Sequence, residues 1–170
     1  MKRLTFCIGF CFCTFALMAQ GSVREANLKA AFIYNFTKYI EWDSSAVQKD
    51  FVIGILGPSP VSGYLLEIAK TKSAKNKRIL IYHYNKPEEI GSCNILFIPE
   101  KTVFPLSTIL EHVGKGVLTI SEQPGYANQG TALNFVIIND KLKFEANLKA
   151  MYTAGLNASS QLLKLAIIIN

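Results

Sequence analysis

The chain has 170 residues, of which 50% are apolar and 18% are charged, and its formal net charge is +6. This length fits a single domain, and the apolar content excludes an intrinsically disordered chain because there is ample surface to bury. With only 11 glycines and 6 prolines, the composition also excludes collagen-like and low-complexity proteins.

The N-terminus has the layout of an export signal. Residues 1–3 form a short basic start, residues 4–18 contain no charge, and small residues follow. An apolar run of about 15 residues is shorter than the roughly 20 that span a bilayer. We therefore expect a cleaved signal peptide at residues 1–20, a mature domain at residues 21–170 and a periplasmic location. An uncleaved membrane anchor is the alternative.

Removal of residues 1–20 changes the cysteine content and the charge. The net charge falls from +6 to +4 because Lys2 and Arg3 are lost, and Cys93 becomes the sole remaining cysteine. A single thiol cannot form an internal disulfide. Cys93 begins an apolar run, so we expect it to be buried, with intermolecular pairing as the alternative.

A long helix is expected over residues 23–42. Ser22 and Glu25 have the spacing of a capping box. Apolar and aromatic residues such as Phe32 and Phe36 then recur every three or four positions, which indicates one wide face packed against a core.

Apolar runs alternate with helical patterns through the middle of the chain. Strands are expected at residues 51–56, 78–84, 94–98 and 117–120, with helices at residues 61–70 and 105–113. This alternation implies crossover connections and a largely parallel sheet.

The order of elements changes toward the C-terminus. Residues 132–138 and 142–144 flank a short polar turn and predict a hairpin. Residues 146–157 and 159–169 are expected to form two helices, the second ending in a buried apolar turn. Together the elements predict an α/β fold, a single-domain three-layer sandwich with a largely parallel central sheet, a C-terminal hairpin and flanking helices.

Catalytic and metal-binding patterns are scarce. The chain has two histidines, and no zinc-ligand spacing is present. Ser59 lies at a strand-to-helix turn, but Val61 stands where a nucleophile elbow needs glycine. We therefore expect no enzyme activity, no metal and no cofactor, and a serine hydrolase is kept as an alternative. The cations at residues 70–78 lack interleaved aromatic residues, so no nucleic-acid partner is expected.

Two kinds of binding site remain candidates. Gly57, Ser59 and Ser121 follow predicted strands, and the ends of parallel strands are common small-molecule sites. Exposed aromatic residues can instead mark a protein contact. Tyr34 and Trp42 lie off the main helical stripe, so core packing and partner binding are both open for them. The predicted partner surface combines aromatic residues of the N-terminal segment with a loop tyrosine: Tyr34, Tyr39, Trp42 and Tyr126.

Several segments resemble the YfiR/HmsC-type periplasmic proteins (the DUF4154 family). They are LKAAFIYNFTKYIEW at 28–42, FVIGILG at 51–57, CNILFI at 93–98, VLTISE at 117–122, FEAN at 144–147, AGL at 154–156 and SSQLLKLA at 159–166. Three positions depart from the family pattern. Asn94 replaces a usual histidine, Thr131 replaces a usual glycine, and Cys93 lacks the second cysteine that redox-regulated members use.

The resemblance implies a non-enzymatic, dimeric α/β protein. Proteins of this type bind the periplasmic sensor domain of an inner-membrane diguanylate cyclase and hold it inactive, which lowers cyclic-di-GMP and restrains biofilm formation. We therefore expect a regulator of this kind, with a homodimer and a membrane-anchored signalling partner. A periplasmic small-molecule binding protein is the alternative function.

Overall fold

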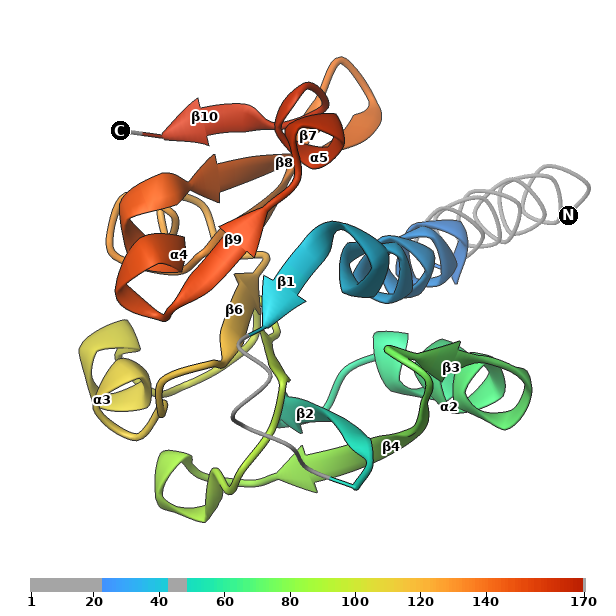
Figure 1. Ribbon diagram of the computed structural model, residues 1–170. Coiled ribbons are helices and arrows are strands. Elements are labelled where there is room, and N and C mark those ends of the chain that lie inside the picture. Colours follow the sequence, from blue (N-terminus) through green and yellow to red (C-terminus); the bar gives the residue numbers. More distant parts are fainter. Residues whose placement is uncertain (1–22, 43–48, 170) are drawn as a thin grey trace, which may run out of the picture.

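The computed structural model describes residues 23–42 and 49–169, so the expected signal peptide lies outside the described residues. An eight-stranded sheet runs through the molecule in the order β10-β8-β7-β6-β5-β2-β4-β3 (Figure 1). Its strands are β2 (Phe51–Leu56), β3 (Ser73–Ala74), β4 (Lys77–Tyr84), β5 (Ile95–Ile98), β6 (Leu118–Ser121), β7 (Leu133–Ile138), β8 (Lys141–Asn147) and β10 (Ile167–Ile169).

The central strands β4, β2, β5, β6 and β7 are mutually parallel, as expected. Strand β2 is buried along its whole length, because a parallel strand between two helical layers has no solvent face. Gly54 in β2 is required by packing. A Cβ atom at this position would lie 2.5 Å from Cε2 of Tyr84, whose ring crosses the strand.

Helical layers cover both faces of the sheet and complete the expected three-layer sandwich. The N-terminal helix (residues 23–39) and α2 (Val61–Thr71) lie on the same side, and α3 (Leu106–Glu111) lies on the other (Figure 1). A short 3-10 turn, η1 (Pro87–Glu89), precedes β5. The fold prediction is therefore confirmed at the level of class and layers.

The aromatic face of the N-terminal helix packs on the C-terminal hairpin. The ring of Phe36 lies 5.0 Å from that of Phe144 and 6.1 Å from that of Phe135. Phe32 contacts the same two rings at 6.0–6.1 Å. The main helical stripe is thus core, and aromatic edge-to-face pairs of this kind add to the burial of apolar area.

The N-terminal helix ends earlier than the sequence pattern predicts. Residues 40–42 form a strand, β1 (Ile40–Trp42), which pairs antiparallel with β9 (Leu156–Ala158) in a separate two-stranded ribbon. Trp42 lies opposite Leu156 in this register. The apolar periodicity could not distinguish this strand from a last helical turn, because its partner lies more than 100 residues away in the sequence.

The prediction of two C-terminal helices, at residues 146–157 and 159–169, is wrong. The segment instead forms α4 (Leu148–Thr153), β9, α5 (Ser160–Leu163) and β10. The side chains of Asn147 and Ser159 cap the two short helices by accepting from the backbone N–H groups of Ala150 and Leu162. The final isoleucines leave the helix and pair in parallel with β8.

The predicted C-terminal hairpin is confirmed, with Phe135 opposite Phe144. Asn139 and Asp140 both have positive φ values (50° and 57°), which is the backbone of a two-residue turn that matches strand twist. Lys75 and Asn76 adopt the same conformation between β3 and β4. This second hairpin was not expected from the basic run in which it lies.

Candidate functional site

The carboxyl ends of β2, β5 and β6 form the topological switch point of the sheet. The chain passes from β2 through α2 to β4 on one side, whereas β5 pairs with the other side of β2. Connections that diverge in this way leave a crevice beyond the strand ends. A cavity of about 240 Å³ lies there, lined by Ala26, Lys29, Pro58, Pro60, Val61, Pro99, Glu100, Lys101 and Glu122.

A charged cluster forms one wall of this switch-point cavity. The Nζ atom of Lys29, in the N-terminal helix, lies 2.5 Å from a carboxylate oxygen of Glu122 and 2.6 Å from one of Glu25. The Lys29 and Glu122 side chains are only 12% and 10% exposed, whereas that of Glu25 is 39% exposed. The buried contact with Glu122 therefore joins the helix to the segment after β6, whereas the more open contact with Glu25 lies within the helix.

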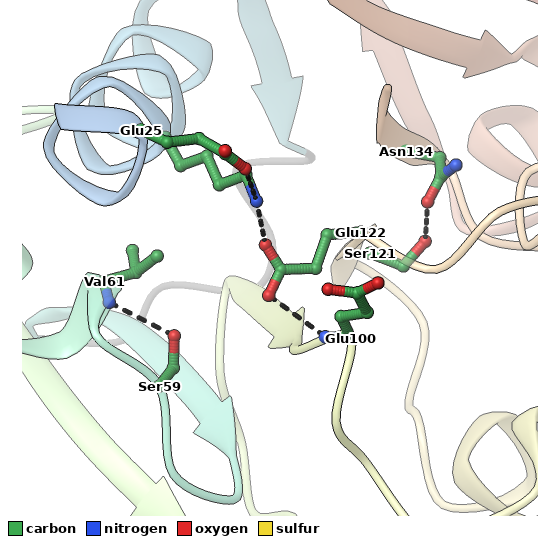
Figure 2. Close-up of polar contacts among 8 residues, drawn as sticks. Glu25, Ser59, Val61, Glu100, Ser121, Glu122 and Asn134 are labelled. Carbon is green, nitrogen blue, oxygen red and sulfur yellow. Dashed lines mark hydrogen bonds and ion pairs between the residues drawn. The ribbon is translucent and has the colours of Figure 1, made fainter. Parts of the chain in front are cut away.

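Glu122 also fixes the loop that follows β5. Figure 2 shows its second oxygen accepting from the backbone N–H of Glu100, at 3.0 Å. The amide of the neighbouring Gln123 donates to the Glu100 carbonyl at 2.7 Å. The backbone N–H and the carbonyl of Glu100 are thus both bound, which holds this part of the cavity wall in place.

The electrostatics of the cluster favour the charged form of Lys29. Burial alone would lower the pKa of this ammonium group, but the hydrogen bonds that it donates to Glu122 and Glu25 outweigh burial and hold the pKa above its ordinary value. Lys29 therefore stays protonated at neutral pH. Because its charge is neutralised by two carboxylates, it is an unsuitable general base.

The three residues predicted as ligand contacts lie at this edge, but their polar groups are already engaged. Gly57 has a φ of 87° and donates its N–H to the Tyr84 carbonyl at 2.7 Å. The Ser59 hydroxyl accepts from the N–H of Val61 at the start of α2, at 3.2 Å (Figure 2). No histidine is recorded as a hydrogen-bond partner of Ser59 in the described part of the chain.

Ser121 is fully buried and belongs to a polar network inside the sheet. Its hydroxyl donates to the amide oxygen of Asn134 at 2.6 Å (Figure 2). The same hydroxyl lies 3.0 Å from the Thr131 hydroxyl. The Asn134 amide in turn donates to Glu145 at 3.0 Å. Satisfied buried networks of this kind specify strand register. The residue that instead reaches the cavity is the next one, Glu122.

The four predicted partner-contact residues do not lie together. Tyr34, Tyr39 and Trp42 are half-buried along the N-terminal helix and β1, on one side of the sheet. Tyr126 is only 9% exposed and packs in the core cluster of the opposite face. Three of the four residues therefore lie on the same side of the sheet, and Tyr126 lies on the other.

Lysines lie over two of these aromatic rings. The Nζ atom of Lys38 is 4.7 Å from the centre of the Tyr34 ring, and that of Lys75 is 5.7 Å from the Trp42 ring. The Trp42 indole also donates to the Asn94 carbonyl at 3.2 Å. The side chain of Asn94 accepts a hydrogen bond from the N–H of Val52 at 2.8 Å. Its role here is structural.

Cys93 is buried, as the sequence predicted. Burial raises the pKa of its thiol to about 12, although a hydrogen bond with the Gly54 backbone opposes this effect. A thiol in this environment is protonated at neutral pH and is a poor nucleophile.

Residues 23–42 and 49–169 contain neither a cluster of metal ligands nor a membrane-spanning helix. There, no group of three or more His, Cys, Asp and Glu side chains is placed to hold a metal ion. None of the helices in these ranges is both long and apolar enough to cross a bilayer.

The fold and the switch-point cavity define a class: a small α/β protein with a doubly wound parallel sheet and an appended antiparallel hairpin. This architecture hosts many functions, so it does not identify one. Residues 26–167 match the family model described as YfiR/HmsC-like. The chain therefore belongs to the YfiR/HmsC-like (DUF4154) family. A comparison with curated proteins finds no match.

Lys29, Glu100 and Glu122 are the site residues that sequence reasoning missed. Lys29 and Glu122 are separated by 93 positions, and neither belongs to a motif with chemical meaning. The one available signal was position, because Glu122 lies two residues after the end of the predicted strand at residues 117–120.

Proposed function

We propose that this protein is an exported, non-enzymatic regulator that binds the periplasmic sensor domain of a membrane-anchored diguanylate cyclase and holds it inactive. The observation that carries the proposal is the family match over residues 26–167. The sequence pattern of residues 1–20, from which we expect a signal peptide, supports a periplasmic location. The scarcity of nucleophile–base pairs in the described residues is consistent with a binding role.

The proposed contact surface is the half-exposed aromatic group of Tyr34, Tyr39 and Trp42. Aromatic side chains are enriched at protein interfaces because they bury a large area with few rotatable bonds. Lys38 and Lys75, which lie over two of the rings, give this surface a cationic rim. The partner face is therefore expected to be apolar with an acidic rim.

Binding is tested with the mature protein and a detergent-solubilised diguanylate cyclase encoded in the same genome, by biolayer interferometry. Tyr34→Ala and Tyr39→Ala are expected to weaken binding by about tenfold each, as interface aromatics do. Tyr152→Ala is the matched control, because this tyrosine is 83% exposed and lies on α4. Unchanged affinity in both test variants would remove the assigned surface, and absence of binding to any membrane cyclase would reject the function.

A homodimer is proposed as part of the same function. Sedimentation equilibrium of the mature domain at micromolar concentration measures the mass directly, and a monomer throughout that range would exclude it.

A small-molecule binding protein is the second candidate, favoured by the switch-point cavity of about 240 Å³. The cavity presents both the carboxylate of Glu100 and the ammonium of Lys101, a combination that suits a zwitterion such as an amino acid. A thermal-shift screen with amino acids and nucleotides tests this function. Stabilisation by an amino acid that Lys101→Gln removes would support it, and no stabilisation by any compound would reject it.

A further inference from the structure

A second and larger cavity lies between α4 and the connection from α3 to β6, away from the switch point. Its volume is about 490 Å³, within the range of roughly 300–1,000 Å³ that small-molecule sites occupy. Its lining includes Leu110, Val113, Val117, Ala150 and Ala154. These side chains come from α3, from the connection between α3 and β6, and from α4 and its C-terminal end, and they give the cavity an apolar floor.

The walls of this α4 cavity are fixed by hydrogen bonds. The N–H of Gly116 donates to the Ala154 carbonyl at 2.8 Å, which ties the loop before β6 to the end of α4. The Asn147 side chain donates to the Ala127 carbonyl at 2.7 Å and accepts from the N–H of Ala150 at 2.8 Å. A cavity held in this way is largely preformed, which lowers the entropic cost of binding.

The charged side chains that line the α4 cavity are all cationic. Lys115 comes from the connection before β6 and Lys149 from α4, and none of the described residues that line the cavity is acidic. Neither lysine forms an ion pair within residues 23–42 and 49–169. The switch-point cavity differs, because its Lys29 already has two carboxylate partners.

Thr119 adds a hydrogen-bonding group to the cavity wall. Its side chain is 5% exposed and its hydroxyl accepts from the N–H of Ala132 at 2.8 Å. No acceptor for the hydroxyl proton is recorded among the described residues, so this proton is available to donate. The lining of the cavity therefore combines two lysines with one threonine whose hydroxyl proton is free to donate.

We infer that the α4 cavity binds a compact organic carboxylate, whose apolar body lies on Leu110 and Val117 and whose carboxylate is held by Lys115 and Lys149. The apolar floor provides burial of the ligand body. The lysines select the charge of its head group. This inference stands apart from the proposed regulatory function, because it needs no partner protein.

The test uses the full mature domain with hexanoate and phenylacetate as probes, followed by isothermal titration and by NMR line broadening of each probe. Both carboxylates are expected to bind, whereas hexanol should bind at least about tenfold more weakly and hexylamine should not bind. Binding of hexanol as tight as that of hexanoate would overturn the charge assignment. Absence of binding by both carboxylates at millimolar concentration would overturn the site.

Variants locate the probe in the α4 cavity. Lys149→Gln and Lys115→Gln are each expected to weaken hexanoate binding by about tenfold. Lys141→Gln, at the β7–β8 turn, is the control and should leave affinity unchanged. Lys101→Gln tests whether hexanoate binds in the switch-point cavity instead. If Lys101→Gln weakens binding and Lys115→Gln and Lys149→Gln do not, the assignment to the α4 cavity is wrong.

A cavity-filling variant provides an independent measurement. Gly114 lines the cavity, and a Cβ atom there would have no neighbour within 4 Å. Gly114→Leu should therefore fold and occupy ligand space, abolishing hexanoate binding. Gly63→Leu is the control, since Gly63 in α2 has equal room and lies outside the cavity. Full affinity in a folded Gly114→Leu protein would contradict the proposal.

Discussion

The ion pair between Lys29 and Glu122 should hold the N-terminal helix on the sheet, and Lys29→Met tests this. The substitution keeps the length of the side chain but leaves the Glu122 carboxylate, 10% exposed, without its cation. Removal of one partner from a fully buried pair costs about 3–5 kcal/mol. Solvent reaches both ends of this pair and Glu122 retains the Glu100 N–H, so we expect about 2 kcal/mol.

The measurement is urea unfolding of Lys29→Met, Glu122→Gln and the double variant, followed by circular dichroism. In a domain of this size, about 2 kcal/mol corresponds to a fall in Tm of about 4–8 °C. The double variant should be destabilised by less than the sum of the single variants, with a coupling of about 1–2 kcal/mol. Lys70→Met is the control, because its pair with Glu67 is 65% and 69% exposed and should contribute less than about 1 kcal/mol.

The stabilisation contributed by Lys29 should decrease at alkaline pH. The pKa of Lys29 is raised in the folded state because its hydrogen bonds with Glu122 and Glu25 outweigh burial. The stabilisation is therefore complete below the unfolded pKa of about 10.4 and is lost as the pH rises toward the folded value. The difference in unfolding free energy between wild type and Lys29→Met should narrow above pH 10. Equal costs for Lys29→Met and Lys70→Met at pH 7, or strict additivity in the cycle, would refute the reasoning.

Three further predictions concern the buried residues Gly54, Cys93 and Ser121, with the exposed Gly63 as a comparison. Gly54→Ala should lower the free energy of unfolding by about 1–3 kcal/mol, because the new Cβ atom meets the Tyr84 ring. Gly63→Ala, in contrast, should raise it by about 0.5–1 kcal/mol through the helix propensity of alanine in α2. Chemical denaturation measures both changes. Cys93, with a thiol pKa of about 12, should react with Ellman's reagent at pH 8 only after denaturation, and rapid reaction of the native protein would contradict its burial. Ser121→Ala should cost about 1–3 kcal/mol in unfolding free energy, because a buried amide oxygen loses its donor.

The central strands could be predicted from the sequence because local signals agree there. Residues 51–56 and 95–98 are continuous apolar runs that end at Gly57 and Pro99, and a strand buried on both faces needs such a run. The turn at Asn139 and Asp140 was equally readable, since these residue types tolerate positive φ. In each case the local sequence and the tertiary environment favour the same structure.

The C-terminal segment was misassigned because the local signals conflict. The apolar residues after Ser159 fit a helical period over one turn, and α5 forms there for four residues. The β-branched run Ile167–Ile169 favours a strand, and pairing with β8 decides the outcome. The switch-point cluster could not be predicted for a similar reason. Lys29 and Glu122 meet only because the helix crosses the carboxyl ends of the strands.

Gly155 lies between α4, which lines the α4 cavity, and β9 of the β1–β9 ribbon. Its substitution tests whether this ribbon opens independently of the main sheet. Gly155 has a φ of 74° and joins α4 to β9, which pairs with the strand that carries Trp42. Gly155→Ala should cost about 1–2 kcal/mol, because an L-residue resists this conformation, and Gly155→Asn should cost less. Amide exchange should then accelerate at the ribbon, where Ser159 donates to the Tyr39 carbonyl at 2.8 Å, more than in β2. Equal acceleration of amide exchange in β2 and in the ribbon would mean that the two open together. In that case the ribbon that carries Trp42 would not be a separate structural unit.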